Sequence, residues 1–303
     1  MFPEPQRLQT KIFAELPEEL RLSHRPSAWA DGQPNVGAIH SLLEGPCFTR
    51  DGRFFCVDVA HGRIFEIVDG RFQVAANYDG APNGMCVHKD GRIFVADFKN
   101  GLMSFDPEDG SVTPLIDGYQ SECFLGVNDL TFAGNGDLYF TDQGLSGLHE
   151  SSGRVFRLDA DGELSVLLNN IPSPNGLVLN RQQTELYLGV TRDNSIWRIP
   201  LLADGGVSKV GRFIQMSGGQ GPDGLAIDSA GNIFVAHVGL GCVWAFNPHG
   251  EPILRIDSCV GRGTTNIAFG GVDRKTLFIT EAESGCIMMA TLDTPGELIF
   301  SHY

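Results

Sequence analysis

One phrase recurs six times along this chain and limits what it can fold into. Each copy has a polar residue, a short apolar run, a tight turn and a second apolar run. The copies begin at Glu44, Asn83, Asn128, Asn175, Asp223 and Asn266, with spacings of 39, 45, 47, 48 and 43 residues. A period of about 40–50 residues is typical of repeat architectures such as propellers and solenoids.

The apolar runs within each copy have the character of β-strands. Runs such as 92–96 and 137–141 are short and contain β-branched and aromatic residues. Turn dipeptides separate them, as at Asp51-Gly52 and Asp90-Gly91, and no amphipathic helix period follows residue 40. The sequence therefore predicts an all-β fold, a six-bladed β-propeller with four-stranded antiparallel blades around a central channel. A pair of β-sandwiches is the rival all-β fold, but it does not explain six copies.

Two segments flank the repeats. Residues 1–38 are expected to form an N-terminal arm packed on the domain, and residues 39–303 the propeller. The arm contains signals for a strand fragment around Ile12 and for one helical turn at 16–20. The alternating segment 297–301 is expected to supply a closing strand.

Composition excludes several kinds of partner. The net charge of −15 argues against nucleic acid and anionic membranes, because both require a basic face. No run of about 18 apolar residues predicts a membrane span, and the N-terminus lacks a signal-peptide pattern. The seven cysteines form no C-x-x-C pair and no zinc spacing, so we expect free thiols and a cytoplasmic protein.

Propeller geometry gives the six leading residues a chemical meaning. The innermost strand of each blade starts at one rim of the channel, so these side chains would surround the axis. All six carry oxygen atoms, which suit a hard cation such as calcium or magnesium, and then manganese. The alternative is that Asn or Asp before Gly only caps its own turn. Glu44 favours the metal site, because Glu is a poor turn residue.

Other motifs carry less information. The G-x-G-x-x-G at 219–224 is followed by a hairpin pattern and not by a helix, so it predicts no dinucleotide site. The nucleophile motif G-x-S-x-G is absent. His149, in the insertion 144–152, and His237, at the end of a strand, fall on the same face as the ring. They are candidate substrate contacts, with solvent or packing roles as the alternative.

Several motifs together resemble one known family. They are E-G-P at 44–46, V-N-D at 127–129, S-P-N-G at 173–176, G-P-D-G-L-A-I-D at 221–228 and T-T-N-I-A-F-G-G at 264–271. In this order they resemble the senescence marker protein / gluconolactonase / luciferin-regenerating enzyme family over residues 40–295. That family comprises regucalcin-like lactonases and is related to diisopropyl-fluorophosphatase. The resemblance implies a propeller with a metal-containing channel, whose ligands fall on Glu44, Asn128, Asn175 and Asp223.

The resemblance also implies an activity. It implies a lactonase, a carboxylic ester hydrolase. From the ligand set we expect one divalent metal to polarise the lactone carbonyl and Asp223, the shorter carboxylate of the ring, to act as base or nucleophile. Calcium is expected first, with manganese, magnesium or zinc as alternatives, and no organic cofactor is needed. The small-molecule lactone would contact Asn83, Asn266, His149 and His237. An arginine that sugar-lactone members carry two residues before Asn128 is absent, and Gly126 stands there.

Two other functions are compatible with this sequence. One is a phosphotriesterase-type hydrolase that cleaves organophosphofluoridates at the same metal. The other is a propeller binding module without chemistry, since the fold alone does not determine function. Metal content and parallel substrate assays would separate the three.

Overall fold

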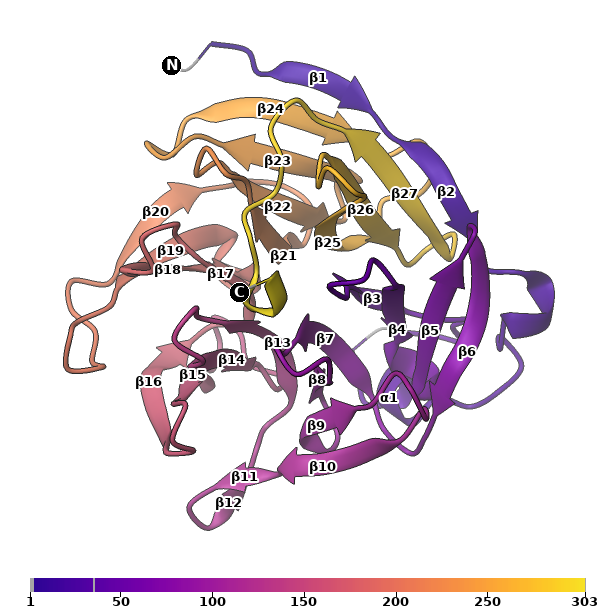
Figure 1. Cartoon of the computed structure of the whole chain (residues 1–303), viewed down its shortest axis with the longest axis horizontal. Helices are drawn as coiled ribbons and strands as arrows, with labels where there is room; N and C mark the ends of the chain where they lie inside the picture. Colours follow the sequence, from indigo (N-terminus) through magenta and orange to yellow (C-terminus); the bar gives the residue numbers. More distant parts are fainter. Residues whose placement is uncertain (1–2, 35, 303) are drawn as a thin grey trace.

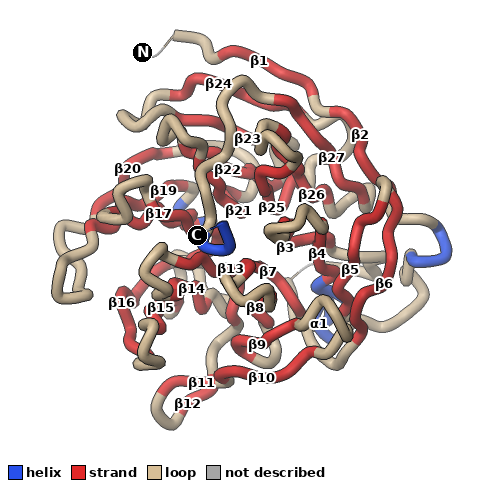
Figure 2. Tube along the Cα trace, in the orientation of Figure 1, coloured by secondary structure: helices blue, strands red, loops and turns tan. Residues whose placement is uncertain are grey.

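The computed structural model describes residues 3–34 and 36–302 and confirms the predicted six-bladed β-propeller (Figure 1). Strands and loops make up nearly the whole of this part of the chain (Figure 2). Its single α-helix is the one-turn α1 (Ala28–Asp31), which follows the 3-10 helix η1 (Glu18–Leu20). Among the described residues no helix has the length and apolar character that a bilayer span requires.

The first three blades are antiparallel sheets formed by consecutive strands. The first contains β3 (Leu43–Phe48), β4 (Phe54–Asp58), β5 (Arg63–Val68) and β6 (Arg71–Asn77), with the 3-10 helix η2 (Val59–His61) after β4. The second contains β7 (Pro82–Val87), β8 (Ile93–Asp97), β9 (Gly101–Phe105) and β10 (Val112–Ile116). A small hairpin, β11 (Gly118–Tyr119) and β12 (Glu122–Cys123), precedes the third blade. That blade contains β13 (Val127–Phe132), β14 (Leu138–Asp142), β15 (Gly153–Leu158) and β16 (Leu164–Ile171).

The last three blades complete the ring. The fourth contains β17 (Pro174–Leu179), β18 (Glu185–Val190), β19 (Ser195–Pro200) and β20 (Gly211–Gln215), with the 3-10 helix η3 (Thr191–Asp193) after β18. The fifth contains β21 (Gly221–Ile227), β22 (Ile233–Val238), β23 (Cys242–Phe246) and β24 (Pro252–Asp257). The sixth contains β25 (Thr264–Gly270), β26 (Thr276–Glu281) and β27 (Cys286–Thr291).

The N-terminal segment closes the ring. Strand β2 (Lys11–Glu15) pairs antiparallel with β27 and is the outer strand of the sixth blade. Strand β1 (Gln6–Gln9) pairs parallel with β24 and widens the fifth blade (Figure 1). The expectation that 297–301 supplies the closing strand is therefore wrong. That segment ends in the 3-10 helix η4 (Phe300–His302).

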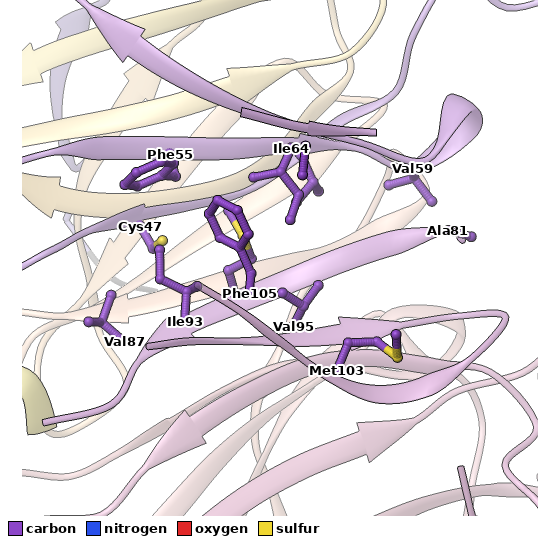
Figure 3. Packing of buried hydrophobic residues seen from close by; sticks show 13 residues of the cluster. Cys47, Phe55, Val59, Ile64, Ala81, Val87, Ile93, Val95, Met103 and Phe105 are labelled. Carbon is purple, nitrogen blue, oxygen red and sulfur yellow. The ribbon is translucent and has the colours of Figure 1, made fainter. Parts of the chain in front are cut away.

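Apolar side chains fill the spaces between neighbouring blades. Between the first and second blades, Phe55 and Ile64 meet Val95 and Phe105, all of them fully buried (Figure 3). Alternating side chains of a strand point to opposite faces, so each blade contributes to two such layers. This packing fixes the angle between blades and therefore the spacing of the inner strands around the channel.

The C-terminal segment covers one mouth of the channel. In Figure 1 the chain ends over the centre of the ring. The Phe300 ring packs on Phe132, with centroids 4.9 Å apart, and on the His88 ring at 5.2 Å. A cavity of about 760 Å³ lies between this segment and the inner strands, and its lining includes Asp129 and Asn266. The residues that begin the inner strands stand at the other end of the channel.

Candidate functional site

A β-bulge in every inner strand positions the predicted site residues. The pairing of inner and second strand is interrupted by two unpaired residues at each copy of the repeat. In the middle copies the first of these two residues is Asn83, Asn128, Asn175 or Asp223. In the first copy Glu44 directly precedes them. A bulge re-aims side chains that regular pairing would direct between the blades.

The sixth copy differs from the prediction by one residue. Thr264 pairs with Glu281 and Ile267 with Ile279, so Thr265 is the first bulged residue and Asn266 the second. The expectation that Asn266 is equivalent to the other five is therefore wrong. Its structural equivalent in the third blade is Asp129, the residue after Asn128. The two hydroxyls of Thr265 and Thr280 bond to each other at 2.9 Å.

Asp129 and Asn266 approach the glycines of neighbouring blades. A Cβ atom on Gly84 would lie 2.2 Å from Asp129 Oδ1, and one on Gly224 would lie 1.9 Å from Asn266 Oδ1. Only glycine fits at these second bulge positions while the neighbour keeps its place. At the second bulge position the third copy has Asp129 and the sixth has Asn266, where the second, fourth and fifth copies have glycine. These two residues add two polar side chains to the ring.

Buried carboxylates hold the loops that lead into the inner strands. In four blades the backbone N–H two residues before the first ring position donates to a carboxylate at the end of the second strand. These bonds run from Leu42 to Asp58 at 2.8 Å, from Ala81 to Asp97 at 3.0 Å, from Gly126 to Asp142 at 2.8 Å and from Gly263 to Glu281 at 2.8 Å. Because these four loops are fixed two residues before their ring residues, the ring side chains of these blades are preorganised.

His237 stands where four of the other blades have these carboxylates. It pairs with Pro222, as Asp97 pairs with Pro82. Its Nε2 lies 2.9 Å from the carbonyl oxygen of Gly218, which can only accept, so Nε2 carries the proton. The ring is buried, and burial lowers its pKa. The structure therefore gives this predicted substrate residue a loop-positioning contact.

A single amide joins three blades at the centre of the site. Nδ2 of Asn266 donates to Oε2 of Glu44 at 2.8 Å and lies 3.3 Å from Oδ2 of Asp129. Glu44 also accepts from the N–H of Gly45, and Asp129 from the N–H of Leu130. In a ring of six, the third and sixth blades face each other, so this contact crosses the channel.

The amide ligands predicted in the third and fourth blades are oriented by their own partners. Asn128 Nδ2 donates to Gln143 Oε1 at 3.1 Å, and Asn175 Nδ2 donates to Thr191 Oγ1 at 3.2 Å. Thr191 in turn donates to the carbonyl of Pro222, next to Asp223. These bonds use the amide nitrogens. The carbonyl oxygen of Asn128 is buried without a partner among the described residues.

Burial raises the pKa of three carboxyl groups in the ring. Burial, then the charges of Asp223 and Asp129, raise the pKa of Glu44 well above its ordinary value. Burial raises the pKa of Asp129 to about 6. Burial and the charge of Asp129 also raise the pKa of Asp223, against a hydrogen bond from Asn175 and the charge of Arg192. The ring thus concentrates negative charge that a cation would neutralise.

These residues fit a hard divalent cation. Among the described residues no three Asp, Glu, His or Cys side chains are grouped so as to hold a metal ion. The donor set of the ring is mixed, however, with amide oxygens beside the carboxylates, and oxygen-only sets of this kind suit calcium. The buried oxygen of Asn128, which has no partner among the described residues, is the most direct sign that the ring fits a cation. Glu44, Asn128, Asn175 and Asp223 would hold the ion.

Sequence reasoning missed one residue of the site. Asp129 was not predicted, although it takes the position held by Gly45, Gly84, Gly176 and Gly224 in other copies. A carboxylate at a repeated glycine position was the available signal. His149 is exposed in a turn closed by Gly147 and Glu150, while Asn83 is buried in the ring.

Comparison with known proteins shows which family the chain belongs to. Residues 42–283 match the family described as SMP-30/Gluconolactonase/LRE-like region. The lactonase drp35 of Staphylococcus epidermidis is 33% identical over 227 residues, which cover 71% of this chain and 69% of the relative. The gluconolactonase of Zymomonas mobilis is 34% identical over 220 residues, which cover 67% of this chain and 61% of the relative.

Solved structures share the fold at lower identity. Regucalcin from Agrobacterium tumefaciens, described as a calcium-binding protein, superposes with a TM-score of 0.76 at 22% identity, over 99% of this chain and all of its own. A gluconolactonase from Xanthomonas campestris superposes with a TM-score of 0.73 at 23% identity, over 85% of this chain and 86% of its own. At these identities the likeness establishes the six-bladed fold.

Proposed function

Because the chain belongs to the SMP-30/gluconolactonase/LRE-like family, we propose that it is an enzyme that hydrolyses lactones at its oxygen-lined ring. We further propose that it requires one divalent metal, calcium first, and that Asp223 serves as the base. The observation that carries the proposal is the ring itself. Three buried carboxyl groups and an unpartnered amide oxygen converge with no cationic side chain hydrogen-bonded to them among the described residues.

The ring would bind both ion and substrate. Glu44, Asn128, Asn175 and Asp223 would hold the ion, which when bound supplies a Lewis acid for the lactone carbonyl. Their side-chain partners Gln143, Thr191 and Asn266 would keep the ligand oxygens aimed. Asn83, buried in the same ring, is proposed as a hydrogen-bond partner for the substrate.

Asp223 is suited to proton transfer. In the metal-free ring, burial and the neighbouring charge of Asp129 raise its pKa. A bound cation would lower this pKa, so the Asp223 carboxylate would be ionised at neutral pH and able to accept a proton. Asp223 would accept a proton from the attacking water as the water oxygen bonds to the carbonyl carbon. The bond between the carbonyl carbon and the ring oxygen then breaks, and Asp223 returns the proton to that oxygen. The product is a hydroxy acid, which releases one proton at neutral pH.

Asn266 is proposed to hold the carboxylates in place. Its amide shares one nitrogen between Glu44 and Asp129, so it fixes the distance between two like charges. His237 and the carboxylates at the strand ends act one step further out, on the loops. None of these contacts requires the substrate to be present.

A combined measurement tests the proposal. Elemental analysis of the purified protein should give about one divalent ion per chain, and a lactone panel followed by acid release should show activity that chelation abolishes. A phosphofluoridate assayed in parallel would reveal the alternative hydrolase. A protein with no bound ion and no hydrolysis of any lactone would be a binding module, and the proposal would fall.

The cellular compartment proposed for this enzyme follows from the oxidation state of its cysteines. All seven lie in the described residues, and none forms a disulfide. Free thiols support a reducing compartment, so we propose the cytoplasm.

A further inference from the structure

Exposed leucines gather on two segments beside the ring. Leu125 is 46% exposed, Leu145 57% and Leu148 71%, on a chain whose net charge is −15. Single exposed leucines are common, but a group on adjoining segments marks a contact surface. The two segments touch, since a Cβ on Gly144 would lie 2.8 Å from Leu125 Cβ. We call these three residues the lid leucines.

The segment that carries Leu145 is anchored to the proposed ligand Asn128. Gln143 accepts from Asn128 at 3.1 Å and donates to Ser173 Oγ at 3.0 Å. Ser146 Oγ donates to the carbonyl of Gln143 at 2.6 Å and accepts from the N–H of Ser173 at 3.0 Å. Leu145 is therefore held at a fixed place beside the third and fourth blades.

The same loop continues towards Asp223. A Cβ on Gly147 would lie 3.7 Å from Cγ of Arg192, and the charge of Arg192 acts on Asp223. The loop thus extends from the side of Asn128 to the side of Asp223. Leu145 and Leu148 lie on either side of Gly147 along this path.

An aromatic ring excludes any side chain two residues before Asn128. A Cβ on Gly126 would lie 2.5–2.8 Å from three carbons of the Phe98 ring, and Gly126 has a φ of +149°. The ring is fixed by packing against the core of the first two blades. An arginine at position 126, suited to hydroxyl groups, could not be accommodated without moving Phe98. This wall, at the ring end of the channel, is apolar, like the lid leucines beside it.

We propose that the substrate is a lactone with an alkyl substituent, whose chain packs on the lid leucines, and not a polyhydroxylated sugar lactone. This inference rests on the proposed lactonase function and names its substrate class. The ring residues would act on the ester, and the lid leucines would remove the alkyl chain from water. Each methylene that is buried should raise kcat/KM by about fourfold, from the free energy of transfer of a methylene group.

The test uses the metal-loaded full chain and γ-lactones of increasing alkyl length, from γ-butyrolactone to γ-decalactone, with D-glucono-δ-lactone alongside. We expect kcat/KM to rise by about twofold to fourfold per methylene until the leucines are covered, with the sugar lactone among the poor substrates. A flat response to chain length, or a preference for the sugar lactone, would overturn the inference. If no lactone is hydrolysed, the proposed function itself fails.

Variants assign the effect to the lid. In Leu145→Ser/Leu148→Ser, the ratio of kcat/KM for γ-decalactone to that for γ-butyrolactone should fall by at least tenfold. The ratio is measured on one preparation, so partial inactivation cancels. Leu202→Ser is the matched control, since Leu202 is 45% exposed in a turn between β19 and β20, and it should leave the ratio unchanged. An unchanged ratio in the double variant would show that the chain binds elsewhere.

Discussion

The metal-free protein should lose stability as the pH rises through the range in which Asp129 ionises. Asp129 has a pKa of about 6 in the folded protein, against an ordinary value of 3.8. The folded state therefore holds this proton more tightly than the unfolded chain does. Ionisation of Asp129 therefore lowers the free energy of unfolding. This loss is absent below about pH 4 and complete above about pH 7, where it reaches about 3 kcal/mol. Glu44 and Asp223 shift in the same direction, so the whole ring opposes folding in this window.

Urea unfolding of chelated protein measures the effect. We compare the wild type with Asp129→Asn, which removes the charge and retains the shape. The variant should gain about 3 kcal/mol relative to the wild type between about pH 4 and pH 8. A weakened bond from Asn266 would subtract about 1 kcal/mol at every pH. Asp161→Asn, at an exposed position, is the control and should show no such trend. Parallel curves for Asp129→Asn and wild type would refute the reasoning.

The remaining predictions concern the ion, the base, the thiols and one ion pair. Glu44→Gln and Asp223→Asn should each lower metal affinity strongly, and full occupancy of either variant under chelator challenge would show that its residue is not a ligand. Excess metal should restore much of the activity lost in Glu44→Gln but little of that lost in Asp223→Asn, because a missing base costs about 10²–10⁴ in rate; equal rescue would make Asp223 a ligand only. Thiol titration of unfolded, unreduced protein should find nearly all seven cysteines free, and three disulfides would contradict a cytoplasmic location. Asp58→Asn should cost about 3–5 kcal/mol in urea unfolding, since it leaves the buried Arg63 unpaired, whereas the exposed Asp79→Asn should cost under about 1 kcal/mol; equal losses would contradict this account.

The sequence contained enough information to predict the blades but not the strand that closes them. Six copies of a strand–turn–strand pattern specify the architecture, because each copy needs neighbours to cover its apolar faces. The closing strand is β2, where Ile12 pairs with Met288, and not the alternating segment at 297–301. Both segments have strand-like patterns. The choice depends on which one reaches the edge of β27, and local pattern contains no information on that distance.

The register of the site was less predictable than its location. The sequence Thr264-Thr265-Asn266 contains one asparagine, and chemical likeness aligned it with Asn83 and Asn128. A bulge breaks the two-residue period of the strand, so alternation cannot correct a slip of one position. Only the pairing of Ile267 with Ile279 shows that Thr265 is the equivalent residue.

The one-residue difference in the register of Asn266 is informative, because Asp129 and Asn266 form a second layer of the ring. A propeller with six equivalent positions would place six similar groups around its axis, at equal distances. Here Asp129 and Asn266 extend from the second bulge positions of facing blades and meet across the channel with Glu44. The glycines of the neighbouring blades leave them the space. Asymmetry within a symmetric fold thus arises from two substitutions at a repeated glycine. As a result Glu44, alone of the proposed ligands, bonds to Asn266, which also contacts Asp129 across the channel.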